Sequence, residues 1–297
     1  MVNYAPVKTI VAFGETLWDL LPAGPALGGA PCNFAYRAAS LGDRAVIVTR
    51  LGRDELGKKA FEQLIALGME TGSVQWDDRH PTGTVPVTID AQGVPEFTIV
   101  KDVAYDFIQP VEIRAEAVCF GSLVQRAPTS RRALHRLLDA SRGAIKFLDI
   151  NLRKECYSRD ILRDSLDRAD LVKLNDAEAV RLREMFGLRG KSVPAIAREV
   201  RRRWSLDACV VTRGERGAFA VSRDDEVEVS GWKVDVVDTV GSGDAFSAAF
   251  LHGWLRGRSL GDCVFFGNAL GALVARTKGA TTPISADEIR RFCGRSI

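Results

Sequence analysis

The chain has 297 residues, of which 46% are hydrophobic and 27% charged, and its formal net charge is +3 at pH 7. This balance predicts a globular protein with a sizeable core, and so small a net charge gives no reason to expect a nucleic acid as partner. The apolar runs fall short of the ~18 residues that a membrane helix needs, and the N-terminus lacks a signal-peptide cleavage pattern, so we expect a cytoplasmic protein that does not bind membranes.

The first elements alternate between strand and helix. Residues 7–14 form a short apolar run that ends in glycine, which predicts a buried strand. A stretch rich in proline and glycine follows, and a helical pattern begins near Pro31. After a second apolar strand, residues 54–68 predict a helix with Asp54 as N-cap and Gly68 as stop.

The rhythm changes between residues 82 and 100, where β-branched residues and a turn predict antiparallel strands of a smaller sheet. From residue 117 onward strands and helices alternate again, up to a predicted strand at 232–240 and two long helices at 244–257 and 260–277. Alternation of this kind predicts a mostly parallel sheet with helices on both faces. Ligands of such sheets bind at the carboxyl ends of the strands, where the smaller sheet could project as a flap.

Two familiar nucleotide motifs are incomplete. Residues 187–192, GLRGKS, end like a Walker A loop but lack its first glycine and follow a helix, so we expect a helix C-cap and a surface loop there. Residues 241–246, GSGDAF, have Phe246 where a dinucleotide fold needs its third glycine, which disfavours a hydride-transfer enzyme. The three histidines, His80, His135 and His252, belong to no motif, which leaves little support for a Ser-His-Asp hydrolase.

The stretch DTVGSGDAF, residues 238–246, combines a glycine turn, a helix start and an acid. The N–H groups of such a turn and the helix N-terminus favour an anion at one spot. Asp244 lies in the first helical turn, either as an acid that complements the helix dipole or as a general base beside a phosphate. The residues alone leave both interpretations open.

Polar residues elsewhere favour the second interpretation. A glycine pair at residues 28–29 opens a helix with Asn33 one turn in, and Asn175 ends a strand three residues before Glu178. The Asn175–Glu178 pair suits a hydrated Mg²⁺ ion, although a simple helix cap would have the same spacing. Residues 149–153 end another strand with polar groups, where a parallel sheet places its ligand.

Taken together, these stretches resemble the ribokinase-like sugar kinases, or PfkB carbohydrate kinase family. The resemblance runs from GGAPCNFA at residues 28–35, through KLNDAE at 173–178, to DTVGSGDAFSAAFLHG at 238–253, with Ser242 where alanine is more usual. It implies an α/β fold, a ribokinase-like three-layer sandwich with a mostly parallel central sheet and a small β lid. Residues 1–297 would form a single kinase domain, with the lid contributed by about 16–30 and 82–108.

The resemblance also implies roles for particular residues. Asp244 would be the catalytic base, and the N–H groups of Gly241, Ser242, Gly243 and Asp244 would stabilise the transferred phosphoryl group of ATP. The other positions that match family sites fall into three groups. Those for the sugar are Asp19, Gly29 and Asn33; those for ATP are Asn175, Thr212, Gly214, Gly217 and Asn268; those for cations are Asn175 and Glu178 (Mg²⁺ through water) and Asp238 and Thr239 (K⁺). Phe97, Tyr105 and Arg153 are further candidates for the sugar, and Arg153 could touch a phosphate instead.

Within the family, residues 14–35, DVAYDFI at 102–108 and FGSL at 120–123 resemble bacterial fructokinases more than ribokinases or adenosine kinases. Phe97 or Tyr105 could then close over the sugar, although either could equally be a structural aromatic. The alternatives to fructose are ribose, 2-keto-3-deoxygluconate and nucleosides, and Arg153 keeps an acid sugar open. An inactive sugar- or nucleotide-binding regulator is a further alternative. The flap strands could also pair between subunits of a homodimer.

Overall fold

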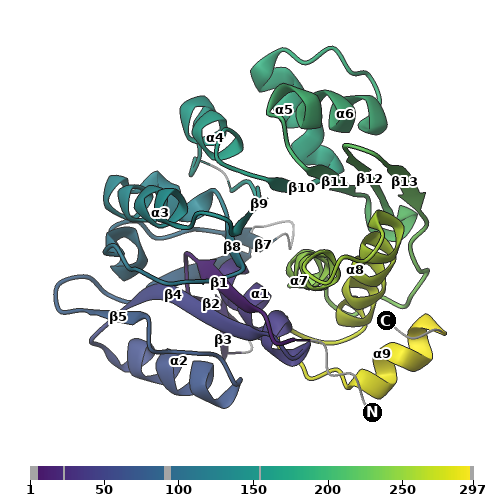
Figure 1. The fold of residues 1–297 in the computed structure, drawn as a ribbon. Helices are drawn as coiled ribbons and strands as arrows, with labels where there is room; N and C mark the ends of the chain where they lie inside the picture. The colour runs from purple at the N-terminus through teal and green to yellow at the C-terminus, as the bar shows by residue number, and fades with distance from the viewer. Residues whose placement is uncertain (1–5, 23, 90–94, 154, 295–297) are drawn as a thin grey trace.

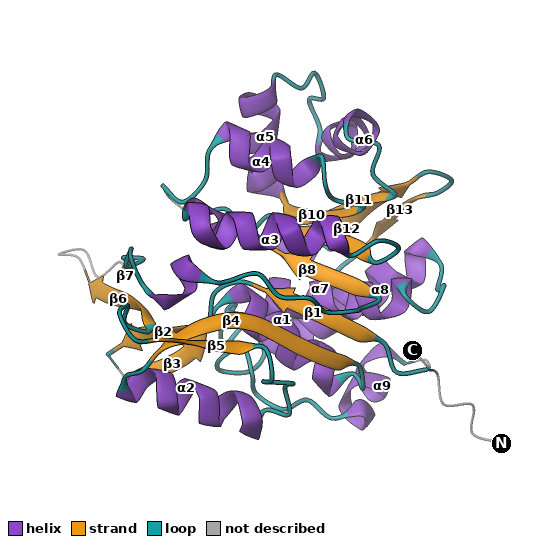
Figure 2. Cartoon of the chain, turned by 60° about the vertical axis from the view of Figure 1, so that its left-hand side comes forward, coloured by secondary structure: helices purple, strands orange, loops and turns teal. Residues whose placement is uncertain are grey.

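The computed structural model describes residues 6–22, 24–89, 95–153 and 155–294, and its backbone is built on a large central sheet with a smaller sheet at one end (Figures 1 and 2). In spatial order, the central sheet consists of β13 (Glu226–Val229), β12 (Ala218–Ser222), β11 (Ala208–Thr212), β10 (Leu171–Asn175), β9 (Ile145–Asp149), β8 (Ala117–Phe120), β1 (Thr9–Phe13), β4 (Arg44–Gly52) and β5 (Val74–Asp77). Only β12 runs antiparallel to its neighbours β11 and β13; the other pairs are parallel.

Helices cover both faces of the central sheet (Figure 2). One face carries α3 (Pro128–Ala140), α4 (Arg159–Leu166), α5 (Asp176–Phe186) and α6 (Val193–Arg203). The other carries α1 (Ala30–Ser40), α2 (Glu55–Ala66), α7 (Ser242–Trp254) and α8 (Leu260–Ala275), with α9 (Ala286–Cys293) packed beyond α8. Strand β1 shows why both faces are apolar: Val11 and Phe13 pack into the α3 side, whereas Ile10 and Ala12 pack into the α7 side.

The smaller sheet has four strands, in the order β3 (Gly24–Gly28), β2 (Leu17–Leu21), β6 (Gly83–Ile89) and β7 (Pro95–Phe97). The hairpin of β2 and β3 comes from the proline- and glycine-rich stretch after β1, and β2 pairs in parallel with β6. The predicted α/β class, with a mostly parallel central sheet and a smaller sheet, is therefore confirmed. The division of the chain into a single domain with a lid stays a prediction.

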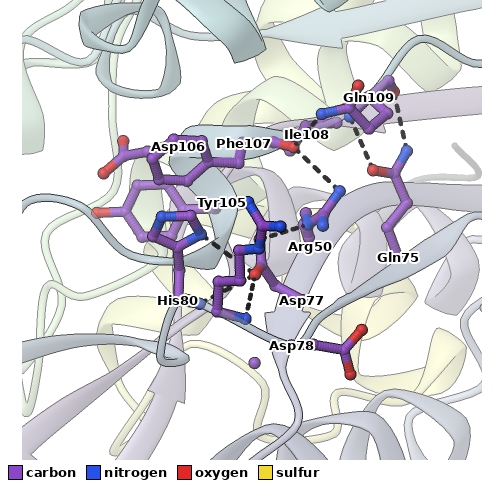
Figure 3. A network of polar contacts seen from close by, with 12 residues as sticks. Arg50, Gln75, Asp77, Asp78, His80, Tyr105, Asp106, Phe107, Ile108 and Gln109 are labelled. Carbon is purple, nitrogen blue, oxygen red and sulfur yellow. Dashed lines mark hydrogen bonds and ion pairs between the residues drawn. The ribbon is translucent and has the colours of Figure 1, made fainter.

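The segment that follows β7 returns to the central sheet, as Figure 3 shows. Arg50 on β4 donates a hydrogen bond to the carbonyl of Phe107 at 3.3 Å, and the same arginine pairs with Asp77 at the end of β5. The ring of His80 stacks on Phe107 with the ring centroids 3.6 Å apart. The 3₁₀ helix of residues Ala104–Phe107 is thus fixed to the body of the protein, outside the four strands of the smaller sheet.

The predicted helix starts are accurate where a polar cap marks them. The Asp54 carboxylate accepts the N–H of Gly57 at 2.7 Å and begins α2, and α1 begins beside Pro31 as expected. The predicted surface loop at 187–192 is also confirmed, because Gly187 ends α5 in a left-handed conformation.

The predicted strand at 232–240 is wrong. The sheet ends at β13, and Val237 and Asp238 donate their N–H groups to the carbonyl of Ala275 at the end of α8. The valines at 236 and 237 are 61% and 63% exposed, so their alternation with polar residues does not reflect a buried face. In the described part of the chain, no helix is both long and apolar enough to span a bilayer.

Candidate active site

The N-terminus of α7 is held in place by the chain before it and by residues 279–280. The two carboxylate oxygens of Asp238 accept the N–H groups of Val240 and Gly279, each at 3.0 Å. Gly241 is the N-cap with φ of 78°, and a Cβ atom there would lie 2.4 Å from that of Ala280. Glycine is therefore required on both conformational and steric grounds. The turn leaves the first N–H groups of α7 free of a side-chain cap, as an anion site needs.

Asp244 lies in the first turn of α7 and is within hydrogen-bond reach of α1. The side-chain amide of Asn33 donates to Asp244 Oδ2 at 2.9 Å, although the two residues are 211 positions apart in the sequence. Burial raises the pKa of Asp244 to about 6, with a further contribution from the negative charge of Asp149, against the hydrogen bond from Asn33. A carboxylate with this pKa is mostly ionised at neutral pH and can accept a proton.

A pocket opens directly beside Asp244, with about 330 Å³ of empty space that includes open solvent at its mouth. It lies where β1, β8 and β9 end and where α1 and α7 begin, which is the edge at which parallel sheets bind ligands. Its walls mix apolar and polar groups, as a small-molecule site requires. The lining residues are Glu15, Ala30, Pro31, Phe34, Cys119, Phe120, Gly121, Ser122, Leu123, Asp149, Asn151 and Asp244.

Glu15 is a pocket residue that the sequence reasoning missed. Its side chain is only 4% exposed, and Oε2 has no hydrogen-bond partner in the described structure. Burial raises the pKa of Glu15 to about 7, while the charge of Arg153 opposes the shift. A buried carboxyl oxygen without a partner is rare and calls for a ligand group or water. The signal was its position, directly after Gly14 at the carboxyl end of the first strand.

The predicted sugar-side residues are partly brought together. Gly29 has φ of 105°, and a Cβ atom there would lie 2.3 Å from the carbonyl oxygen of Glu15, so the glycine pair packs against the pocket wall. Asp19 on β2 lies beside Gly28, and burial raises its pKa while Arg153 lowers it. The positive charge of Arg153 therefore lowers the pKa of Asp19, Glu15 and Asp244.

The two aromatic candidates differ. Phe97 ends β7 and is 55% exposed, so it is free to contact a ligand. Tyr105, by contrast, is fully buried and is not a pocket residue. Its hydroxyl accepts a hydrogen bond from Arg126 at 3.0 Å, and its ring fills the space beside Gly83. The expectation that Tyr105 closes over a sugar is corrected, because the segment around it is fixed to the central sheet (Figure 3).

Asn175 and Glu178 form a reciprocal helix cap. The Asn175 side chain accepts the N–H of Glu178, and Glu178 Oε2 accepts the N–H of Asn175, both at 2.8 Å. The other oxygen, Oε1, accepts the N–H of Leu152 at 2.8 Å. The structural interpretation of this motif is therefore confirmed: the pair begins α5 and ties it to the chain after β9. A bound cation would have to be coordinated by these same oxygens, which already accept N–H groups, or be bound to them through water molecules.

The predicted nucleotide residues gather around the ends of β11 and β13. Thr212 ends β11 and donates its hydroxyl to the carbonyl of Leu174 at 3.2 Å. Gly214 and Gly217 flank a short turn with φ of 60° and 84°, and Asn268 on α8 donates to the carbonyl of Val229 at 3.1 Å. Since a Cβ atom on Gly217 would lie 2.0 Å from that same carbonyl oxygen, Gly217 and Asn268 meet at one point.

A comparison with known proteins identifies the class to which this fold and site belong. The model of the pfkB family carbohydrate kinases matches residues 24–287. Fructokinase-1 of Oryza sativa subsp. japonica is 32% identical over 306 residues, covering 92% of this chain and 93% of the relative. The chain therefore belongs to the pfkB family of carbohydrate kinases, as its motifs suggested.

Solved structures agree on the fold. A fructokinase of Vibrio cholerae O395, determined with fructose, ADP and a potassium ion, superposes with a TM-score of 0.85 at 24% identity, over 97% of this chain and 98% of its own. A sugar kinase of Pyrococcus horikoshii in complex with ATP superposes with a TM-score of 0.79 at 26% identity, over 95% of this chain and 97% of its own.

Proposed function

We propose that this chain is an ATP-dependent fructokinase that transfers the γ-phosphoryl group of ATP to a hydroxyl group of fructose. The observation that carries the proposal is the position of Asp244, a half-buried carboxylate in the first turn of α7 that also lines a pocket. The identity to Fructokinase-1 supports fructose as the substrate.

In the proposed reaction, a sugar hydroxyl lies beside Asp244 and loses its proton to the carboxylate as its oxygen attacks the γ-phosphorus. The bond from that phosphorus to the bridging oxygen of ADP breaks, and ADP leaves. The N–H groups in the first turn of α7, which have no side-chain cap, would stabilise the negative charge on the transferred group, because they lie beside the base. The site thus works by positioning and electrostatics.

Sugar recognition falls to groups around the pocket. Asp19, Gly29 and Asn33 would bind hydroxyl groups, with Arg153 and Phe97 at the rim. Glu15 joins this set because its Oε2 lacks a partner inside the pocket wall.

ATP would lie across the ends of β10 and β11, against Thr212, Gly214, Gly217 and Asn268. The related sugar kinase solved with ATP supports a nucleotide site in this fold. Mg²⁺ fits Asn175 and Glu178 only through water, because both carboxylate oxygens of Glu178 accept backbone N–H groups. K⁺ would bind main-chain oxygens of the loop that Asp238 and Thr239 hold, where it would supply positive charge near the phosphates.

The smaller sheet would act as the lid of the pocket, since it contributes Asp19 and Phe97. Its edge strands β3 and β7 are where a second copy could pair in a homodimer. An activity that depends on ATP suits the cytoplasm, which is where we place the protein.

The test is ADP release with Mg-ATP and K⁺ across fructose, ribose, 2-keto-3-deoxygluconate, adenosine and fructose 6-phosphate. We expect ADP release to be fastest with fructose. In Asp244→Asn we expect the release of ADP to be lost. Preference for another sugar would overturn fructose and keep the mechanism. Absence of sugar-dependent ADP release, with ATP or sugar still bound, would instead identify a binding regulator.

A further inference from the structure

A buried ion pair lies directly behind the start of α7. Lys173 on β10 and Asp149 at the end of β9 are register partners on neighbouring strands. The Lys173 ammonium is 3.1 and 3.2 Å from the two oxygens of Asp149, and the side chains are 8% and 9% exposed. Burying such a pair costs solvation that its attraction seldom exceeds, so stability alone gives little reason to keep it.

The pair contacts α7 at two points. Ser247, one turn after Asp244, donates its hydroxyl to Asp149 Oδ2 at 2.7 Å. A Cβ atom on Gly243 would lie 3.0 Å from the Lys173 ammonium, so the lysine head group packs against the anion turn itself. A cation is normally unfavourable at a helix N-terminus, and here Asp149 compensates for it. The turn thereby gains a positive charge close to its backbone.

We propose that Lys173 and Asp149 are positioning residues for the phosphoryl transfer: through Ser247 and Gly243 they hold the first turn of α7, and they fix the charge that Asp244 experiences. This inference rests on the proposed kinase function and gives a role in it to two residues that lie in the recognised motifs but received no role from them. Neither residue need touch the sugar, although Asp149 reaches the pocket wall.

The charges around Asp244 determine the direction of the test. Asp149 raises the pKa of Asp244, whereas Lys173, Arg153 and the hydrogen bond from Asn33 lower it. Glu15 faces Asp244 from the loop after β1, and Glu178 faces Lys173 from α5. Two thiols, Cys32 and Cys119, complete the surroundings, and burial raises the pKa of both, so they stay neutral.

Removal of Lys173 and removal of Asp149 should therefore shift the pH profile of kcat/KM in opposite directions. In Lys173→Met, the acid limb of kcat/KM should move up by roughly one pH unit, because Asp149 is left unopposed beside Asp244. In Asp149→Asn it should move down by a similar amount. Lys173→Arg keeps the charge and should return the limb toward that of the wild type.

The matched control is Asp43→Asn, which breaks a buried ion pair at the opposite end of α7. Asp43 accepts hydrogen bonds from His252 and Arg256, each at 2.7 Å, and it is far from the pocket residues. This variant should lose thermal stability and leave the acid limb in place. Shifts of the same sign in both pair variants, or no shift beyond that of Asp43→Asn, would overturn the inference.

If the single variants do not fold, the double variant Lys173→Met/Asp149→Asn removes both charges together. It should keep the acid limb near that of the wild type and lose about tenfold in kcat as the turn loosens; a wild-type kcat would overturn the inference. If the wild type releases no ADP, the carboxyl carbon of Asp244 can be titrated by NMR in the ligand-free protein. Opposite shifts there would support the charge effect even though the proposed kinase function had failed.

Discussion

A carboxylate that must take a proton from an alcohol cannot be an ordinary surface aspartate, whose pKa is too low to make it an effective base. At Asp244, burial and the neighbouring Asp149 raise the pKa to about 6. Asn33 limits this rise by donating a hydrogen bond to the ionised form. The residue is thus poised near the working pH of a cell while keeping its charge.

We expect Asp244→Asn to lower kcat by ~10²–10⁴-fold, because the amide cannot accept the hydroxyl proton. Sugar binding, measured by calorimetry, should persist, since the asparagine retains the shape of the side chain. In the wild type, kcat/KM should fall below about pH 6 as Asp244 becomes protonated. Turnover of Asp244→Asn near the wild-type value would exclude Asp244 as the base.

Glu15 gives a separate prediction about substrate binding. Its Oε2 has no partner, so a sugar hydroxyl should supply one. Glu15→Gln should raise the KM for sugar ~10-fold, as expected when the hydrogen bond of a buried group is lost, and should change kcat little. The exposed Glu62→Gln on α2 is the matched control. An unchanged KM would show that Glu15 is not a sugar contact.

At the scale of an element, the start of α7 depends on one glycine. Gly241→Ala must adopt φ near 78° and place a methyl group 2.4 Å from Ala280. Gly257→Ala also has positive φ, 67°, but meets nothing within 4 Å. Each should lose ~1 kcal/mol of unfolding free energy for the backbone, and only Gly241→Ala should also lose activity, because its turn must move. Equal kcat values in the two variants would contradict this role for the turn.

The same elements show what the sequence could predict. Helix starts were accurate where a cap or a proline marks them, as at Asp54 and Pro31. The segment 232–240 has the alternating hydrophobic pattern of a strand. It forms none, because the segment lies against the end of α8 and has no strand beside it to pair with. The hydrophobic pattern of a segment indicates which secondary structure its residues prefer. Whether a neighbouring strand is present to pair with the segment depends on the whole fold.

The candidate site divides along the same line. Asp244 and Asn33 stand in recognisable motifs, and the structure brings them together. Glu15, Asp149 and Lys173 come from different strands and acquire their environments only where those strands align. Tyr105 shows the converse, since its aromatic ring resembles a ligand contact in the sequence, whereas tertiary packing buries it completely.

For the whole molecule, the raised pKa values make the folded state sensitive to pH. Asp244 and Glu15 bind protons more tightly when folded, so the stability they contribute is present at low pH and lost as pH rises through about 6 and about 7. Asp244→Asn should remove the part of this loss of stability that comes from Asp244. The variant should therefore gain stability over the wild type as the pH rises from about 4 to about 6 and keep that gain at higher pH, on the order of 1–3 kcal/mol.

Thermal unfolding of the ligand-free proteins at each pH checks this, because titrating groups whose pKa does not depend on Asp244 cancel in the difference between variant and wild type. A difference that stays constant with pH would mean that Asp244 titrates alike in the folded and unfolded chains.

The pairing of α1 with α7 also has a consequence for biosynthesis. The amide that holds the base and the base itself are separated by 211 positions, so they cannot meet until most of the chain has left the ribosome. A nascent chain that ends before α7 already contains Gly29 and Asn33 but lacks Asp244. Incomplete chains should therefore be unable to consume ATP. The catalytic activity of a preparation then reports the fraction of molecules in which α1 and α7 are in contact.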